Sequence, residues 1–260
     1  MSTIAWLNDT PLEDLGLGPR SANWWDSVVF ERTTIPLVDQ FGQVASNVGT
    51  GAPRELQIEC LLEATSVSDR RDKLDAIMRL IGYGPVELRV QDDEDRVLLA
   101  RLVNYTAAQF SDNPYGGQPY LDVTLELVAD DPTFYDRYAR AVGLSTSAAE
   151  VAVGTLPNYG VLYLQGASDP TVTYKAHSGE TVATLELAYT WASGDVYRVD
   201  LGLQTIDKIA SGTRTNGISV YSTGDFFSLD PRDGDAAAAD WPTITLSTGS
   251  GVIYYQRRWS

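Results

Sequence analysis

The sequence predicts a mainly β protein with one amphipathic helix in its N-terminal half and an all-β sandwich in its C-terminal half. Residues 54–128 combine two-residue hydrophobic alternation, which is typical of half-buried strands, with a single stretch of helical periodicity. From residue 142 onward, short β-rich segments recur between glycine turns at the spacing of a sandwich, and no useful helical periodicity appears. These observations together set the fold class.

The first well-patterned strand is expected at 55–64. Its apolar side carries Leu56, Ile58, Cys60, Leu62 and Ala64, and its polar side carries Glu55, Gln57, Glu59 and Glu63, interrupted only by Leu61. A second strand at 121–127 alternates in the same way, with Asp122, Thr124 and Glu126 between its apolar residues. Since successive side chains of a strand point to opposite faces, both strands are expected to bury one face and expose an acidic one.

A helix is expected after Ser66, with an apolar stripe made by Leu74, Ile77, Met78 and Ile81. Ser66 suits the N-cap, and Asp69 suits the positive end of the helix dipole. Gly82 followed by Pro85 provides the stop. A strand at 86–90, an acidic turn at 92–95 and a strand at 97–105 that is apolar on both faces follow.

The first 53 residues are less regular. They predict strands at 3–7 and 24–31, joined by turns at 8–11 and 16–19. Segment 39–53 is glycine-rich and lacks apolar patterning, so it is read as an extended loop: either an ordered interaction arm, which its place before the best strand favours, or a disordered segment. The candidate arm contacts are Asp39, Phe41, Gly42, Val44 and Val48.

The C-terminal sandwich is predicted from nine short segments. They lie at 160–164, 171–174, 181–189, 196–201, 205–209, 217–221, 226–229, 243–246 and 252–258. A boundary near residue 140 divides the chain into domains at 1–140 and 141–260, which suits its length of 260 residues.

Charge and cysteine content exclude several classes of protein. The formal net charge is −16, spread over 12 Lys and Arg against 23 Asp and Glu in the first 140 residues and 7 against 12 in the rest. Gripping nucleic acid by its phosphates needs a clustered basic surface, so DNA would only pass nearby. Cys60 is the only cysteine, which excludes an internal disulfide and favours synthesis in a reducing compartment. We expect neither a signal peptide nor a membrane span.

The sequence offers no catalytic set. His177 is the only histidine and lies in a predicted turn, while Cys60 lies in the other domain, so neither a nucleophile with its base nor a typical zinc site is expected. Asp230, Asp233, Asp235 and Asp240 are interpreted as solvated turn acids in preference to calcium ligands. We therefore predict no enzyme activity, no cofactor and no metal.

Four segments, in order, resemble the distal tail protein (Dit) family of long-tailed bacteriophages, components of the siphophage baseplate hub. They are the opening LNDTPLEDLGL at 7–17, VADDPTFY at 128–135, GDFFSLD at 224–230, and the closing run from Trp241-Pro242 to YYQRRW at 254–259. Residues 247–250 depart from the Gly-Asn pair expected before the last strand. The resemblance extends over nearly the whole chain through turn and strand signals.

The resemblance implies a β-sandwich or split-barrel-like N-terminal domain with one helix and a belt near 39–53, followed by a galectin-like β-sandwich. It further implies a structural virion protein at the tail tip, made in the host cytoplasm, that forms a hexameric ring through which DNA passes. Its implied partners are the tail tube protein, the hub or tip protein, the tape-measure protein and receptor-binding proteins. The acids Glu55, Glu59, Glu63, Asp122 and Glu126 are expected to face the lumen.

Two alternatives stay open. The sequence holds 14 Tyr and 6 Trp, and several of these stand next to strand ends. Most are expected in the sandwich core, but exposed aromatics there would fit a carbohydrate-binding module or adhesion protein that uses the C-terminal domain. A glycosidase is the third reading, and no carboxylate pair stands out for it.

Overall fold

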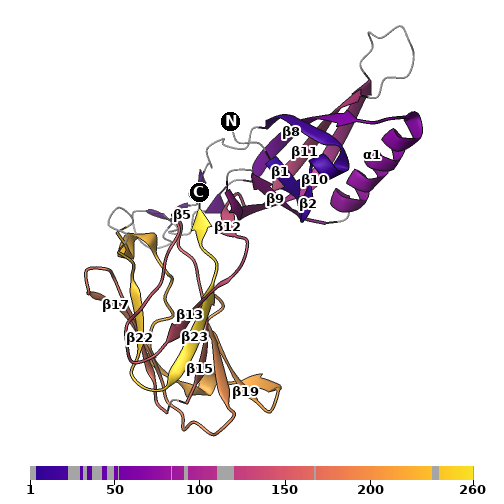
Figure 1. Ribbon diagram of the computed structural model, residues 1–260. Helices are drawn as coiled ribbons and strands as arrows, with labels where there is room; N and C mark the ends of the chain where they lie inside the picture. The colour runs from indigo at the N-terminus through magenta and orange to yellow at the C-terminus, as the bar shows by residue number, and fades with distance from the viewer. Residues whose placement is uncertain are drawn as a thin grey trace. The chain divides into compact units, whose positions relative to one another are not determined.

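The computed structural model consists of two compact units, Met1–Arg137 and Tyr138–Trp259. Antiparallel strands are the main elements of each unit (Figure 1). In the described part of the chain, no helix has the length and apolar character needed to cross a membrane. The structure describes residues 4–22, 30–31, 34–36, 43–45, 50–51, 53–82, 84–90, 93–109, 120–166, 168–235 and 240–259.

The N-terminal unit is a curled sheet with strand order β2-β1-β9-β10-β11-β8-β3, and β12 pairs with one end of β10. A short 3-10 helix, η1 (Glu13–Leu15), joins β2 to β3. The strands are β1 (Ile4–Leu7), β2 (Thr10–Pro11), β3 (Leu17–Ala22), β8 (Arg54–Glu63), β9 (Val86–Val90), β10 (Asp93–Gln109), β11 (Tyr120–Ala129) and β12 (Phe134–Asp136).

The two strictly alternating segments lie side by side as β8 and β11. Ile58 stands opposite Leu125 and Cys60 opposite Val123, so the apolar rows of both strands meet on one face. These side chains are almost completely buried, which confirms the predicted alternation. Burying a large aliphatic side chain stabilises the fold by about 1.5–3 kcal/mol, so a one-residue slip of register, which would expose the apolar row of the strand that slips, is strongly disfavoured.

The predicted helix is α1 (Val67–Ile81), which runs alongside the sheet (Figure 1). The Ser66 hydroxyl accepts a hydrogen bond from the backbone N–H of Asp69 at 3.1 Å, which confirms the N-cap. Lys73 donates to the carbonyl of Glu63 at 2.8 Å and ties the helix to the end of β8. At the other end, a Cβ on Gly82 would lie 2.5 Å from the Met78 carbonyl oxygen, so a glycine is required where the helix stops.

Two predicted turns in this unit are wrong in part. The segment 16–19 was expected to be a turn, but β3 begins at Leu17 because this segment pairs with β8 along its length. The acidic turn at 92–95 is shorter than predicted, since Asp93 already pairs with Val90 and β10 starts there. In both places pairing with a neighbouring strand overrides the local turn preference of Gly, Pro and Asp.

The C-terminal unit is a sandwich of two antiparallel sheets. One sheet has the order β13-β23-β15-β18-β19-β20 and the other β14-β22-β16-β17-β21. Their facing side chains form one continuous core that includes the fully buried Tyr174, stacked on Phe227 at 5.0 Å between ring centroids. The mainly β fold class with one helix and a terminal β-sandwich is thereby confirmed. The strands are β13 (Arg140–Leu144), β14 (Ala149–Glu150), β15 (Val161–Gln165), β16 (Thr171–Lys175), β17 (Thr181–Leu187), β18 (Val196–Asp200), β19 (Thr205–Ala210), β20 (Thr213–Asn216), β21 (Tyr221–Gly224), β22 (Thr243–Leu246), β23 (Ser250–Tyr255) and β24 (Arg258–Trp259).

Two of the nine predicted sandwich segments are not strands as expected. Most of 217–221 forms the 3-10 helix η2 (Ile218–Val220), because the Asn216 side chain accepts from the Ile218 N–H at 2.9 Å and starts a tight turn. Segment 226–229 alternates in burial like a strand, yet only Leu229 bridges to another segment, at Asn158. Hydrophobic alternation indicates which side chains are buried, but it does not indicate whether another segment pairs with the backbone to form a strand.

Candidate functional site

The candidate site in the N-terminal unit is the outer face of β8 and β11, here termed the acidic face. All five acids predicted for this surface lie on it, because their positions share the outward phase of the two strands: Glu55, Glu59, Glu63, Asp122 and Glu126. Four are exposed and Asp122 is half-buried. The structure thus brings together residues that are up to 71 positions apart in the sequence.

The register of the two strands staggers these charges. Gln57 stands opposite Glu126, Thr124 opposite Glu59, and Leu61 opposite Asp122, so each of these acids faces a neutral side chain across the ladder. Directly opposed like charges destabilise a sheet, whereas diagonal neighbours are roughly 7–8 Å apart and solvent screens their repulsion. The stagger therefore permits a densely negative surface on a regular sheet.

Strand β10 extends the acidic face. The side-chain amide of Asn104 donates to the Glu126 carboxylate at 3.2 Å. Arg101 forms two hydrogen bonds with Asp130, at 3.1 and 3.3 Å, and these bonds raise the pKa of the guanidinium. Because the Arg101 and Asp130 side chains are both more than half exposed, the ion pair adds little stability. The pair also engages the positive charge of Arg101 with the Asp130 carboxylate.

Exposed apolar side chains on β10 are the feature that the sequence interpretation missed. The strand is expected to be apolar on both faces, and one of these faces is exposed: Leu99 is 44%, Val103 57% and Tyr105 40% exposed. The register of β10 against β11 shifts between Leu102 and Asn104, which marks a bulge at Val103. A strand has two apolar faces here, and the described part of the chain covers only one of them; such a pattern is the signal that could have indicated a contact surface.

Comparison with known proteins gives one result that bears on the fold. No protein-family model matches the sequence, and no curated protein matches it significantly. Among solved structures, the crystal structure of Dit (gp 19.1) from phage SPP1, described as a paradigm of the hub adsorption apparatus in phages that infect Gram-positive bacteria, is 14% identical, with a TM-score of 0.68 over 100% of both chains.

The chain has the Dit fold. This confirms, at the level of the fold, the resemblance drawn from the sequence. Two structures of the phage p2 baseplate in its activated conformation, with Sr and with Ca, also match; they are 9% and 10% identical, with TM-scores of 0.45 and 0.46 over 95% of this chain and 92% of theirs.

The predicted arm of this Dit-fold chain falls largely outside the described residues, as do Asp39, Phe41, Gly42 and Val48. Val44 lies in β6 (Gln43–Ala45), which pairs with β5 (Thr34–Pro36). Nearby, β4 (Phe30–Glu31) pairs with β7 (Thr50–Gly51). The loop interpretation of 39–53 is therefore wrong at β6 and β7, because β4 and β5 supply partner strands that the weak apolar pattern did not indicate.

The remaining candidates of the sequence do not assemble into a reactive site. Burial raises the pKa of the Cys60 thiol to about 12, so its nucleophilic thiolate is strongly disfavoured. His177 is exposed, and its ring nitrogen Nδ1 lies 3.2 Å from the carbonyl of Asp233. The Arg232 side chain lowers the pKa of Asp230, and Asp235 pairs through its backbone with Asp240. Among the described residues, no three His, Cys, Asp or Glu side chains are grouped to hold a metal ion.

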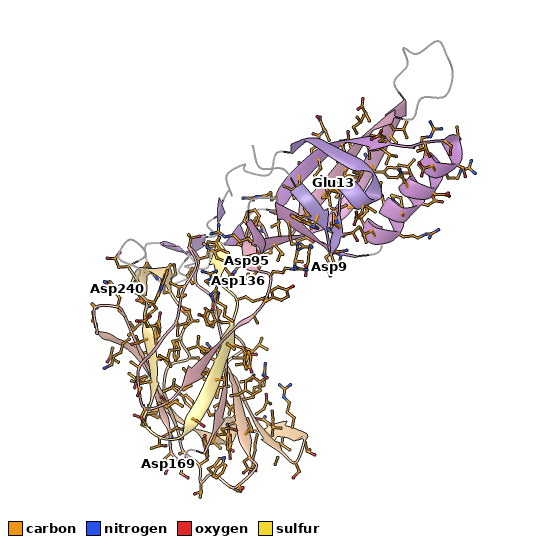
Figure 2. The ribbon with its side chains drawn as sticks, viewed as in Figure 1. Asp9, Glu13, Asp95, Asp136, Asp169 and Asp240 are labelled. Carbon is orange, nitrogen blue, oxygen red and sulfur yellow. The ribbon has the colours of Figure 1, made fainter. Side chains whose placement is uncertain are left out.

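Acidic side chains are distributed over both units of the Dit fold. Figure 2 labels Asp9, Glu13, Asp95 and Asp136 in the N-terminal unit and Asp169 and Asp240 in the C-terminal unit. Some are tied to cations: Asp9 contacts the guanidinium of Arg137, and Arg89 lies 3.5 Å from the same carboxylate. The acidic face differs from these single sites because its carboxylates share one regular surface.

Proposed function

We propose that this chain is a distal tail protein: a structural component of a phage virion that forms a hexameric ring between the tail tube and the baseplate hub. The observation that carries the proposal is the match to the Dit protein of phage SPP1, which extends over the whole of both chains. The proposal assigns the chain no enzymatic activity. It places the protein in the tail tip after synthesis in the host cytoplasm.

The ring assigns roles to the surfaces described above. The acidic face, with Glu55, Glu59, Glu63, Asp122 and Glu126, lines the lumen and repels passing DNA, since like charges keep a polyanion from adhering. Segment 39–53, which contains β6 and β7, forms the arm that wraps a neighbouring subunit. The tail tube, hub, tape-measure and receptor-binding proteins are the partners that such a ring would contact.

Ring formation is tested by light scattering coupled to size exclusion and by negative-stain images of the purified chain. A ring with a central pore and the mass of six chains is expected, and a monomer at all concentrations would refute the proposal. Deleting 39–49 tests the arm: loss of the ring with both units still folded is expected, and an unchanged hexamer would refute the arm's role.

Lumen placement is tested by charge reversal on a matched pair of variants. Glu55→Lys with Glu59→Lys changes the acidic face, while Asp72→Lys with Asp75→Lys makes the same change in charge on the exposed side of α1. Only the first variant is expected to retain duplex DNA in a filter assay at low salt. Equal retention by both, or a map that places Glu55 and Glu59 on the outer wall, would refute the lumen assignment.

A further inference from the structure

An open groove of about 510 Å³ lies on the outer face of the sheet that contains β15, β18 and β23. Besides the buried Gly251, its lining comes from outward positions on these three neighbouring strands: Val161, Tyr163, Gln165, Val196, Val252 and Tyr254. Binding sites for small ligands commonly measure 300–1,000 Å³ and combine apolar walls with a few polar groups. The groove has this size and this composition.

Two tyrosines form the sharpest feature of the groove. The rings of Tyr163 and Tyr254 are perpendicular, with centroids 5.6 Å apart, so together they make a corner with two aromatic walls. Tyr254 is 44% exposed, so part of its ring is accessible to a ligand. An aromatic face carries partial negative charge and attracts the weakly positive C–H groups of a flat, partly apolar ring.

The neighbouring strand leaves space beside this corner. Gly143 on β13 stands opposite Val252 in the ladder, and a Cβ built on it would meet no atom within 4 Å. The same row of the sheet would otherwise carry a side chain at this point. The absence of one at Gly143 keeps that side of the groove open to a ligand.

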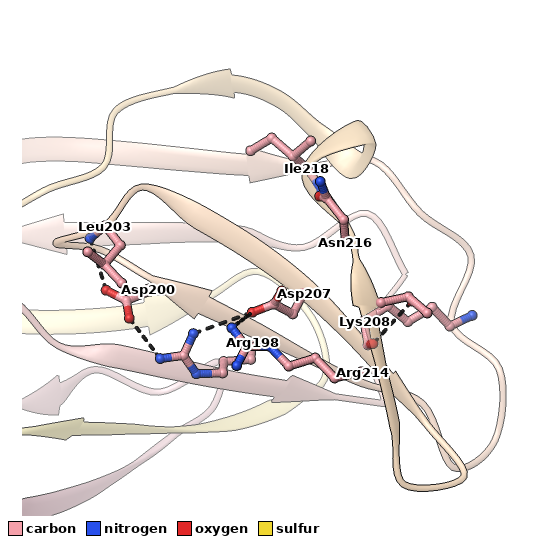
Figure 3. Close-up of polar contacts among 9 residues, drawn as sticks. Arg198, Asp200, Leu203, Asp207, Lys208, Arg214, Asn216 and Ile218 are labelled. Carbon is pink, nitrogen blue, oxygen red and sulfur yellow. Dashed lines mark hydrogen bonds and ion pairs between the residues drawn. The ribbon is translucent and has the colours of Figure 1, made fainter.

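The charges next to the groove are balanced. Arg198 stands opposite Tyr163 in the ladder and lies 2.7 Å from Asp200 and 3.4 Å from Asp207, and Arg214 lies 2.6 Å from Asp207 (Figure 3). Two guanidinium groups are thus engaged by two carboxylates, which leaves no excess of positive charge to hold a phosphate or carboxylate. A hydroxyl-rich, uncharged ligand fits this environment better than an anionic one, all the more on a chain with a net charge of −16.

We propose that the groove binds a neutral saccharide, with one sugar ring stacked against the exposed face of Tyr254. Gln165 and the Tyr254 hydroxyl supply hydrogen bonds to the sugar hydroxyls at the rim, while Tyr163 contributes its ring and is itself hydrogen-bonded to Arg198. Perpendicular aromatic walls, an open side and balanced charge together select this class of ligand. The assignment does not depend on ring assembly, so either proposal can fail without the other.

The test uses the full chain and a panel of neutral mono- to tetrasaccharides made of hexoses, 6-deoxyhexoses and N-acetylhexosamines, with sialylated and phosphorylated saccharides for comparison. Binding is measured by saturation-transfer NMR and then by calorimetry. Tyr254→Ala is expected to weaken binding of a neutral saccharide about tenfold, because it removes one stacked ring. Tyr105→Ala is the matched control, since Tyr105 is similarly exposed, at 40%, but lies in the other unit.

A second variant separates loss of the groove from loss of the fold. Gly143→Val fills open space in a strand, so it is expected to keep or raise thermal stability while abolishing binding. Three results would each overturn the proposal: no neutral saccharide binds, only anionic ones bind, or Tyr254→Ala and Gly143→Val bind like the parent chain. A change in sedimentation of the saccharide-free chain caused by Tyr254→Ala would also overturn it, because the face would then contact another copy.

Discussion

Replacing Tyr174 with phenylalanine tests what organises the segment around η3 (Pro231–Asp233). The Tyr174 ring is completely buried, and its hydroxyl accepts a hydrogen bond from the backbone N–H of Asp230 at 3.2 Å. The Tyr174 hydroxyl also donates a hydrogen bond to the Asp233 carboxylate. Tyr174→Phe keeps the stacking on Phe227 but leaves the Asp230 N–H without its partner.

A buried donor left without a partner costs about 1–3 kcal/mol, so we expect Tyr174→Phe to lower the free energy of unfolding of the sandwich by about 2 kcal/mol. For a unit of this size that corresponds to a fall in Tm on the order of 8 °C. Calorimetry measures the shift, and hydrogen exchange at the Asp230 amide should accelerate in parallel. Tyr159→Phe, at an exposed tyrosine, is the control and should change stability by less than about 0.5 kcal/mol. An equally small effect of Tyr174→Phe, with unchanged exchange at Asp230, would refute the assigned role.

Three more outcomes follow from the same contacts. Ser66→Ala should lower the stability of the N-terminal unit by about 1 kcal/mol in urea denaturation, because it removes the N-cap hydrogen bond. Ser68→Ala, inside the first turn of the helix, should not lower the stability in this way, and equal effects of the two variants would contradict the role of Ser66 as the cap. Burial raises the pKa of Tyr174 and Tyr189, so the stability that both contribute is fully present below the ordinary tyrosine pKa of about 10 and should fall as the pH rises above it. Absorbance at 295 nm measures the ionisation, and titration of all 14 tyrosines near their ordinary pKa without unfolding would contradict this. Gly224→Ala should prevent folding of the sandwich, because Gly224 has φ +102° and a Cβ there would lie 2.0 Å from the Thr184 carbonyl oxygen. Gly179→Ala is the control: Gly179 has φ +86° with no atom within 4 Å of a Cβ, so this variant should lose only about 1 kcal/mol of stability in thermal melts. Similar effects of the two variants would refute the steric argument.

The elements predicted correctly are those whose determinants are local. The N-cap at Ser66 depends on a hydroxyl and an N–H three residues apart, and the outward position of Glu59 follows from the two-residue period of its own strand. The acidic face could therefore be predicted residue by residue, including Asp122 and Glu126 on a strand far along the chain. What it faces depends on other molecules, and so does not follow from alternation.

The errors arise where a distant segment decides the outcome. Leu17 begins a strand because β8 lies beside it, and Val103 is exposed because no other part of the described chain covers that side of β10. The groove on the sheet of β15, β18 and β23 could not be predicted for a similar reason. Tyr163 and Tyr254 are 91 positions apart, and only the pairing of β15 with β23 places them at one corner. Their abundance in the sequence indicated exposed aromatics in general but not this pair.

The pairing of β8 with β11 has a mechanical consequence. Both strands are ten residues long and remain in register from end to end, without a bulge. In an antiparallel ladder the hydrogen bonds run perpendicular to the strands, so a pull along the strand axis loads all of them at once instead of opening them one by one. The acidic face is thus carried by the part of the N-terminal sheet that is best arranged to resist shear, which would hold its carboxylates in fixed positions under axial load.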